Sequence, residues 1–197
     1  ETLENISKEW LEKQKGKMRQ WHFTAENVHD FGWAADKDYV HTSMQIPNGP
    51  MVHFFYSSKT ANIENWEKIQ EYVPKYFQFM EEKFGKYPYA QFSLIQGGDG
   101  GMEYPMCTMM LGGGKSFKGF IGLFVHEATH NWYYGILGSN ENRYPWMDEG
   151  FTSFAEEEFM NAHFDEKKRV NPHVGAYGSY MYLLGIADTV PGFHEPM

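Results

Sequence analysis

Three runs of β-branched and aromatic residues dominate the hydrophobic pattern over about residues 19–57. These runs are RQWHFTAENV, DYVHTSMQI and MVHFFYSS. Turn-forming residues, among them Asp30, Gly32, Asn48 and Pro50, interrupt the pattern. Short runs of this kind, bounded by such residues, predict antiparallel strands joined by tight turns.

A helical pattern follows the predicted strands. From residue 63 to residue 84 the apolar residues recur at intervals of three and four, the spacing of one helix face. We expect one long helix here, kinked at Pro74 because proline lacks a backbone donor, and ended by Gly85. Residues 91–96 then indicate a strand that leads into the glycine-rich loop 97–101.

Two further helices are predicted in the second half of the chain. Residues 117–137 are mostly apolar. Residues 147–163 form the second helical stretch, and it is opened by Asp148 and Glu149, acids that suit a helix N-terminus. Glycine, asparagine and proline punctuate the connection between the two stretches, so the chain can return past the first helix. The pattern as a whole predicts an α+β fold.

Composition narrows the possible functions. The chain has 17 basic and 26 acidic residues and a net charge of −9, so it lacks the basic stripe that a nucleic-acid partner requires. The sequence contains no run of eighteen apolar residues, so it predicts no transmembrane segment. The single cysteine, Cys107, provides neither an internal disulfide nor a cysteine-based zinc site, and we expect it to be a small buried residue.

The sequence His126-Glu127-Ala128-Thr129-His130 carries the candidate chemistry. On a helix, His126 and His130 lie on one face and can present two imidazole nitrogens to one metal ion. Glu127 is rotated by about 100° from His126, so it can flank the metal and act as the general base. A catalytic zinc needs a third protein ligand and one open position, and Glu149 fits the first need. We therefore predict one Zn²⁺ ion held by His126, His130 and Glu149.

The ligand imidazoles also need hydrogen-bond acceptors for their second ring nitrogens. Glu156, seven residues after Glu149, is one candidate for this outer shell. The alternative is that the acidic run 156–158 is a solvated helix face. The remaining histidines share no ligand spacing, which argues against a second metal site.

Two motifs in the chain resemble those of the aminopeptidase N family of gluzincin metallopeptidases, which also includes leukotriene hydrolase-type enzymes. One is the histidine motif at 126–130, followed after eighteen residues by Glu149 within Trp-Met-Asp-Glu-Gly. The other is Gly100-Gly101-Met102-Glu103, which resembles the exopeptidase motif of the family. The resemblance covers about residues 60–197 best.

The resemblance implies that residues 1–197 form part of a thermolysin-like catalytic domain, with a small mixed sheet packed on a helical lobe. The β-rich, substrate-edge part with one long helix would span about 19–116. The helical zinc-binding part would span about 117–197. The rest of a larger polypeptide is expected beyond these residues, and the family analogy favours an exported or envelope-facing enzyme.

The resemblance also implies a substrate class, namely peptides with a free N-terminus. A carboxylate at Glu103 could pair with the substrate's α-ammonium group and place the first peptide bond over the metal. Gly100, Gly101 and Met102 would line the substrate backbone, and glycine permits its close approach. Two alternatives remain open: a thermolysin-like endopeptidase, which needs no amine anchor, and a non-catalytic peptidase-like binding or scaffold module.

The sequence departs from the family pattern in two places. Tyr104 stands where the family motif has asparagine, which leaves the adjoining substrate subsite open. The family's oxyanion-stabilising tyrosine lies well beyond the third zinc ligand, and the resemblance places it after Met197. The tyrosines at 177, 180 and 182 lie too near Glu149 to match it. This stretch alone is therefore expected to be catalytically incomplete.

Overall fold

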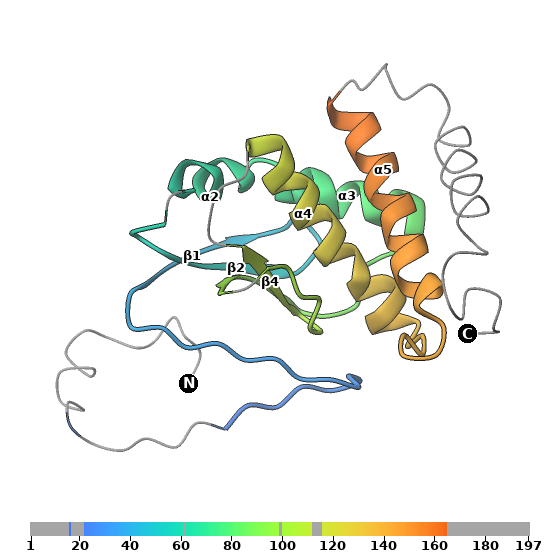
Figure 1. Cartoon of the computed structure of the whole chain (residues 1–197), viewed down its shortest axis with the longest axis horizontal. Helices are drawn as coiled ribbons and strands as arrows, with labels where there is room; N and C mark the ends of the chain where they lie inside the picture. Colours follow the sequence, from blue (N-terminus) through green and yellow to red (C-terminus); the bar gives the residue numbers. More distant parts are fainter. Residues whose placement is uncertain (1–15, 17–21, 61, 99, 112–115, 165–197) are drawn as a thin grey trace, which may run out of the picture.

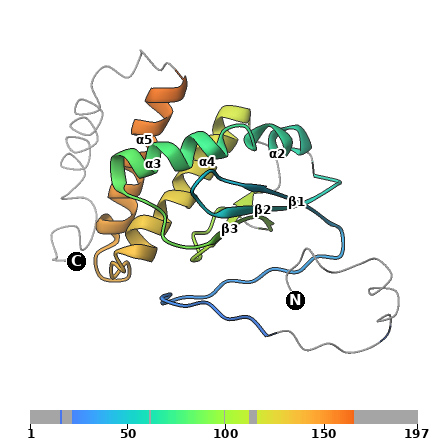
Figure 2. The same cartoon turned by 180° about the vertical axis from the view of Figure 1, so that it is seen from behind.

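The computed structural model describes residues 16, 22–60, 62–98, 100–111 and 116–164. In these residues the fold is α+β, as the sequence predicts, with helices gathered on one side of a four-stranded sheet (Figures 1 and 2). The strand order is β1-β2-β3-β4, and the strands are β1 Tyr39–Gln45, β2 Met51–Ser57, β3 Gln91–Gly97 and β4 Cys107–Leu111.

The sheet is mixed. Strands β1 and β2 form the predicted antiparallel hairpin, whereas β3 runs parallel to β2 and β4 runs parallel to β3. The prediction of a strand before β1 is wrong for the described residues, because residues 22–38 form turns and bends without a ladder. Strand β4 was not predicted, since its methionines carry little β-propensity and fill gaps in many contexts.

The long helix predicted for residues 63–84 is divided into α2 (Ile63–Ile69) and α3 (Val73–Phe84). Pro74 does not kink a continuous helix. It is the second residue of α3, where a backbone N–H has no intrahelical acceptor and its loss costs nothing. Gly85, with a φ of 107°, ends α3 as expected.

The two predicted C-terminal helices are present, but both contain π-helical turns. Helix α4 (Phe117–His130) begins at the Ser116 cap and continues into the π-helix η2 (Asn131–Ile136). Helix α5 (Phe151–Phe164) is preceded by the π-helix η3 (Trp146–Gly150). Asp148 and Glu149 therefore lie in a π-helical turn and not in the first turn of an α-helix.

Aromatic side chains fill the core between the helices and the sheet. The ring of Tyr76 on α3 lies at its centre and contacts rings from its own and neighbouring elements, namely those of Phe77, Phe124, Trp132 and Phe159. The hydroxyl of Tyr76 is 3.1 Å from Oγ1 of Thr129, the fourth residue of the histidine motif, and this contact is buried. The indole of Trp132 also donates to the carbonyl of Gly85 at 2.8 Å. These contacts fix the C-terminal end of α4 in the core.

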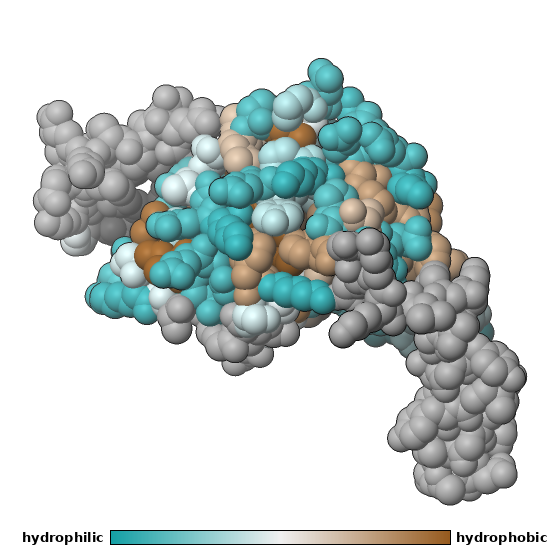
Figure 3. Space-filling model, turned by 90° about the horizontal axis from the view of Figure 1, so that it is seen from above, coloured by the Kyte–Doolittle hydropathy of each residue, from teal (hydrophilic) through white to brown (hydrophobic). Residues whose placement is uncertain are grey.

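The surface seen from above the helices is mostly polar, with separate apolar spots (Figure 3). Of the helices in the described ranges, none is long and apolar enough to cross a membrane.

Candidate metal centre

Three donor atoms converge between the C-terminal half of α4, which carries both histidines, and η3, which carries Glu149. The Nε2 atoms of His126 and His130 are 3.3 Å apart. The Oε2 atom of Glu149 lies 3.3 Å from the first Nε2 and 3.7 Å from the second. Helix α5 packs on α4 and the connection reverses the chain (Figure 1), which returns Glu149 to the histidines.

The triangle formed by these atoms has the size that a tetrahedral zinc site requires. Zinc–nitrogen bonds of about 2.0–2.1 Å place neighbouring ligand atoms about 3.3–3.4 Å apart. Two edges of the triangle have this length, and the third needs only a small movement of Glu149, whose side chain is 58% exposed. The two imidazoles and the carboxylate therefore fit one zinc ion.

Both imidazoles have a carboxylate partner at the second ring nitrogen. Glu156 Oε2 is 3.1 Å from Nδ1 of His126, and Asp148 Oδ1 is 2.7 Å from Nδ1 of His130. When Nδ1 donates to a carboxylate, the Nε2 lone pair is free to bind a metal. Thr152 Oγ1 also lies near this ring nitrogen, 3.4 Å from Nδ1 of His130. Glu156 thus contacts His126, and its role as an outer-shell partner stays a prediction; Asp148 is a contact that sequence reasoning missed.

The same contacts change the pKa values of the imidazoles. The hydrogen bond to Glu156 raises the pKa of His126 above its usual value. Burial is the largest influence on His130 and lowers its pKa, but the hydrogen bond and the charge of Asp148 outweigh burial, so the net pKa is raised. Both carboxylates increase the basicity of the imidazole that they contact, which favours binding of a cation.

Glu127 lies beside the donor triangle and is 8% exposed. Burial raises its pKa to about 7, the positive charges of His126 and His130 lower it, and the neighbouring Glu103 and Glu149 raise it further. Its carboxylate also lies directly against the backbone of Gly101: a Cβ atom added to Gly101 would overlap it. The absence of a side chain at Gly101 therefore leaves room for the Glu127 carboxylate.

The exopeptidase-like loop forms the outer edge of the sheet next to these groups. Met102 exchanges two backbone hydrogen bonds with Met109 on the outer side of β4. Glu103 follows. One of its carboxylate oxygens lies within 4.8 Å of a carboxylate oxygen of Glu127 and of a ring nitrogen of His130. The backbone N–H of Met106 donates to Oδ1 of Asn131 at 2.9 Å and ties the loop to η2.

Glu103 also belongs to a group of three carboxylates with Glu141 and Asp148, whose oxygens lie within 4.8 Å of one another. Burial raises the pKa of Glu141, and the charges of Glu103 and Asp148 raise it further. This group lacks an imidazole, so the histidine-containing triangle is the better match to the ligand preferences of zinc.

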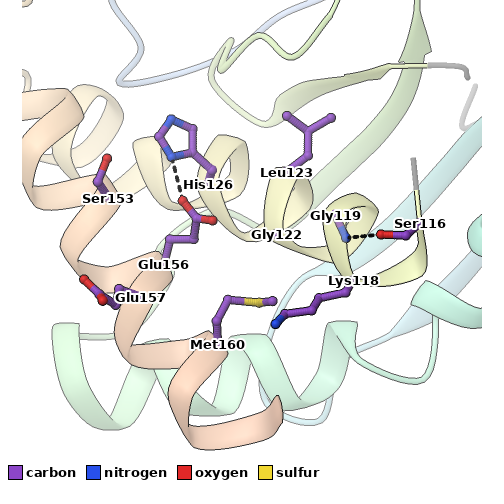
Figure 4. Close-up of a pocket in the computed structure, with 10 residues that line it drawn as sticks. All are labelled: Ser116, Lys118, Gly119, Gly122, Leu123, His126, Ser153, Glu156, Glu157 and Met160. Atoms are coloured by element: carbon purple, nitrogen blue, oxygen red, sulfur yellow. Dashed lines mark hydrogen bonds and ion pairs between the residues drawn. The ribbon is translucent and has the colours of Figure 1, made fainter. Parts of the chain in front are cut away.

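A groove of about 610 Å³ lies between α4 and α5 and reaches the metal centre at one end (Figure 4). His126, Ser153 and Glu156 line that end. Lys118 and Met160 line the other end. The exposed side of His126 is therefore open to this groove.

Three sequence-based expectations concern residues near or beyond the site. Tyr104, the departure from the family motif, lies with its ring against Gly32 of the N-terminal segment. The tyrosines at 177, 180 and 182 lie outside the described residues. Cys107 is half-buried, and burial raises the pKa of its thiol to about 11, which disfavours the nucleophilic thiolate.

Comparison with known proteins shows a shared fold. No family model matches the sequence. Native leukotriene A4 hydrolase from Saccharomyces cerevisiae aligns with a TM-score of 0.52 and 21% identity, over 76% of this chain and 24% of the yeast chain. The yeast enzyme in complex with bestatin aligns with the same TM-score and identity, over 77% of this chain and 24% of that one. The chain thus spans about a quarter of the length of these structures, and the likeness establishes the α+β fold.

Proposed function

We propose that this chain is part of the catalytic core of a zinc-dependent aminopeptidase with a thermolysin-like domain. The donor triangle of His126, His130 and Glu149 carries the proposal, because its edges suit zinc and both imidazoles have carboxylate partners. The fold shared with a quarter of yeast leukotriene A4 hydrolase supports it, and the bestatin complex of that enzyme supports a peptide-like substrate.

A bound zinc ion would supply Lewis acidity, which polarises a peptide carbonyl and acidifies water. Glu127 would take a proton from the attacking water and pass it to the leaving amine. Burial brings the pKa of Glu127 to about 7 without a cation, and a bound cation would lower this pKa and favour the charged form that accepts a proton. Asp148 and Glu156 would hold the imidazoles in the orientation that binds the metal.

Glu103 would determine that cleavage starts from a free N-terminus. Its carboxylate lies next to Glu127 and His130, so a paired α-ammonium group would be held close to the reacting bond. The backbone of Gly101 lies against Glu127, and the next residue, Met102, pairs with Met109 on the outer side of β4, so an extended peptide could pair with this edge.

Replacement Glu127→Gln tests the proposed base in the full-length, zinc-loaded polypeptide. We expect the zinc content to remain and kcat to fall by about 10²- to 10⁴-fold, the usual contribution of a general base. Glu158→Gln on α5 is the matched control, because it removes a carboxylate that has no proposed role in the site. Normal turnover by Glu127→Gln with zinc bound would show that another group is the base.

Blocking the substrate's amine tests the choice between exopeptidase and endopeptidase. We expect hydrolysis of an aminoacyl anilide and none of its N-acetyl derivative. We also expect Glu103→Gln to slow hydrolysis of the aminoacyl anilide. Equal hydrolysis of both substrates would favour the endopeptidase. A zinc-loaded protein that cleaves no peptide would favour the binding or scaffold module.

A further inference from the structure

Three tyrosines contact a segment near the N-terminus, and two of them, Tyr134 and Tyr104, belong to elements that carry the candidate site. We call this segment, residues 27–33, the strap. The hydroxyl of Tyr89 donates to the carbonyl of Asn27 at 2.9 Å. In Figures 1 and 2 the strap extends past the sheet toward the end of α4, where it meets η2.

The second tyrosine, Tyr134, belongs to the extension of the metal helix. Its hydroxyl donates to Oδ2 of Asp30 at 2.7 Å, and its carbonyl accepts from Nε2 of His29 at 2.6 Å. The hydrogen bond from Tyr134 lowers the pKa of Asp30, so the carboxylate is charged at neutral pH and the bond is charge-assisted. Tyr134 follows the ligand His130 by four residues, which is about one helical turn.

The third tyrosine, Tyr104, belongs to the loop that carries the proposed amine anchor. Its ring packs so closely on Gly32 that a Cβ atom there would lie 2.6 Å from Cγ of the ring. Tyr104 directly follows Glu103. The strap therefore contacts both the anchor loop and the metal helix, and it ties the position of Glu103 to that of His130.

We propose that the strap acts as a brace that fixes the distance between the amine anchor Glu103 and the metal centre, so that only one residue fits between the substrate's free amine and the scissile bond. This inference rests on the proposed aminopeptidase function. A substrate with two residues before the scissile bond needs a longer distance between its amine and the metal. A loosened brace would permit that distance, whereas an intact brace excludes it.

Substrate selectivity in the full-length, zinc-loaded polypeptide tests the brace. The measured quantity is the ratio of kcat/KM for an aminoacyl p-nitroanilide to kcat/KM for the dipeptidyl p-nitroanilide that is one residue longer. Asp30→Ala and Tyr134→Phe each remove one partner of the same hydrogen bond. We expect each to lower the ratio about tenfold, as loss of one hydrogen bond to a charged group would. The double variant should match the single variants.

Two further variants separate bracing from general damage. Gly32→Val places a side chain in the space of the Tyr104 ring, so the ratio should fall without any change at Asp30. Tyr87→Phe is the matched control, because it keeps the ring and removes a hydroxyl whose hydrogen bond goes to the carbonyl of Gln91 and not to the strap. Its ratio should equal that of the unaltered protein.

The possible results distinguish a failure of the brace from a failure of the proposed aminopeptidase function. If the unaltered protein cleaves the aminoacyl substrate but Asp30→Ala and Tyr134→Phe lower both kcat/KM values in parallel, the brace is overturned and the aminopeptidase stands. If the unaltered, zinc-loaded protein cleaves neither substrate, both the aminopeptidase and the brace are overturned. Should Asp30→Ala fail to fold, Tyr134→Phe decides, since it retains the buried ring.

Discussion

Replacing Asp148 with alanine should weaken zinc binding, although Asp148 is not a proposed ligand. Its carboxylate accepts from Nδ1 of His130 at 2.7 Å, and both side chains are at most 2% exposed. Water cannot easily take the place of the lost acceptor. A buried hydrogen bond to a charged group contributes about 1.5–3 kcal/mol, so we expect the affinity for zinc to fall about tenfold to a hundredfold.

Glu156→Ala provides the comparison with a less buried partner. Glu156 accepts from His126 at 3.1 Å, but its side chain is 32% exposed. Water can replace this acceptor, and we therefore expect a loss of less than about tenfold. Both variants remove a carboxylate partner of a proposed ligand imidazole, and the deeper burial and the shorter hydrogen bond of Asp148 both predict the larger loss there.

The assay is competition for Zn²⁺ with a chromogenic chelator, made on the full-length polypeptide at fixed pH. Glu158→Ala, on the same helix, serves as the charge-matched control and should bind zinc normally. Circular dichroism before and after metal removal checks that each variant is folded. Unchanged affinity in Asp148→Ala, or a larger loss in Glu156→Ala, would refute this reasoning.

Three further predictions follow from the same contacts. Gly101→Ala should push the Glu127 carboxylate aside and lower kcat about a hundredfold while zinc content stays unchanged; normal kcat would show that the loop yields instead. His126 and His130 have pKa values raised above 6.5, and zinc binds the neutral imidazoles, so affinity should fall as pH drops through these values in titrations from about pH 8 to about pH 5.5. Tyr76→Phe removes the buried contact with Thr129 and should lower the free energy of unfolding by about 1 kcal/mol, measured by urea denaturation; an unchanged value would mean that the contact contributes nothing.

The parts of the site that the sequence could predict are those set by local geometry. The spacing of His126 and His130 places both imidazoles on one face of any helix. The structure brings their nitrogens and Glu149 together, and the role of these residues as metal ligands stays a prediction. The same local rules located the end of α3 at Gly85, although not the break between α2 and α3, because a glycine that ends a helix with a positive φ needs no tertiary information.

The parts that could not be predicted depend on contacts between distant residues. Asp148 looked like an acid at a helix N-terminus, and only the π-helical path of η3 directs it to His130. The contacts from His29 and Asp30 to Tyr134 span 105 and 104 residues, and no periodicity marks them. Residues 22–28 were therefore misread as part of a strand, since aromatic runs predict strands even where single side-chain contacts hold the segment.

The concentration of acidic side chains around two imidazoles explains why a cation would change the chemistry of the site. Burial raises the pKa of Glu127 to about 7, and the charges of Glu103 and Glu149 raise it further, so near neutral pH its carboxyl is divided between the protonated and the charged form. A divalent cation at the donor triangle would favour the charged form and lower this pKa. Metal binding would thus also convert Glu127 into the form that accepts a proton, which couples the ligand set to the base.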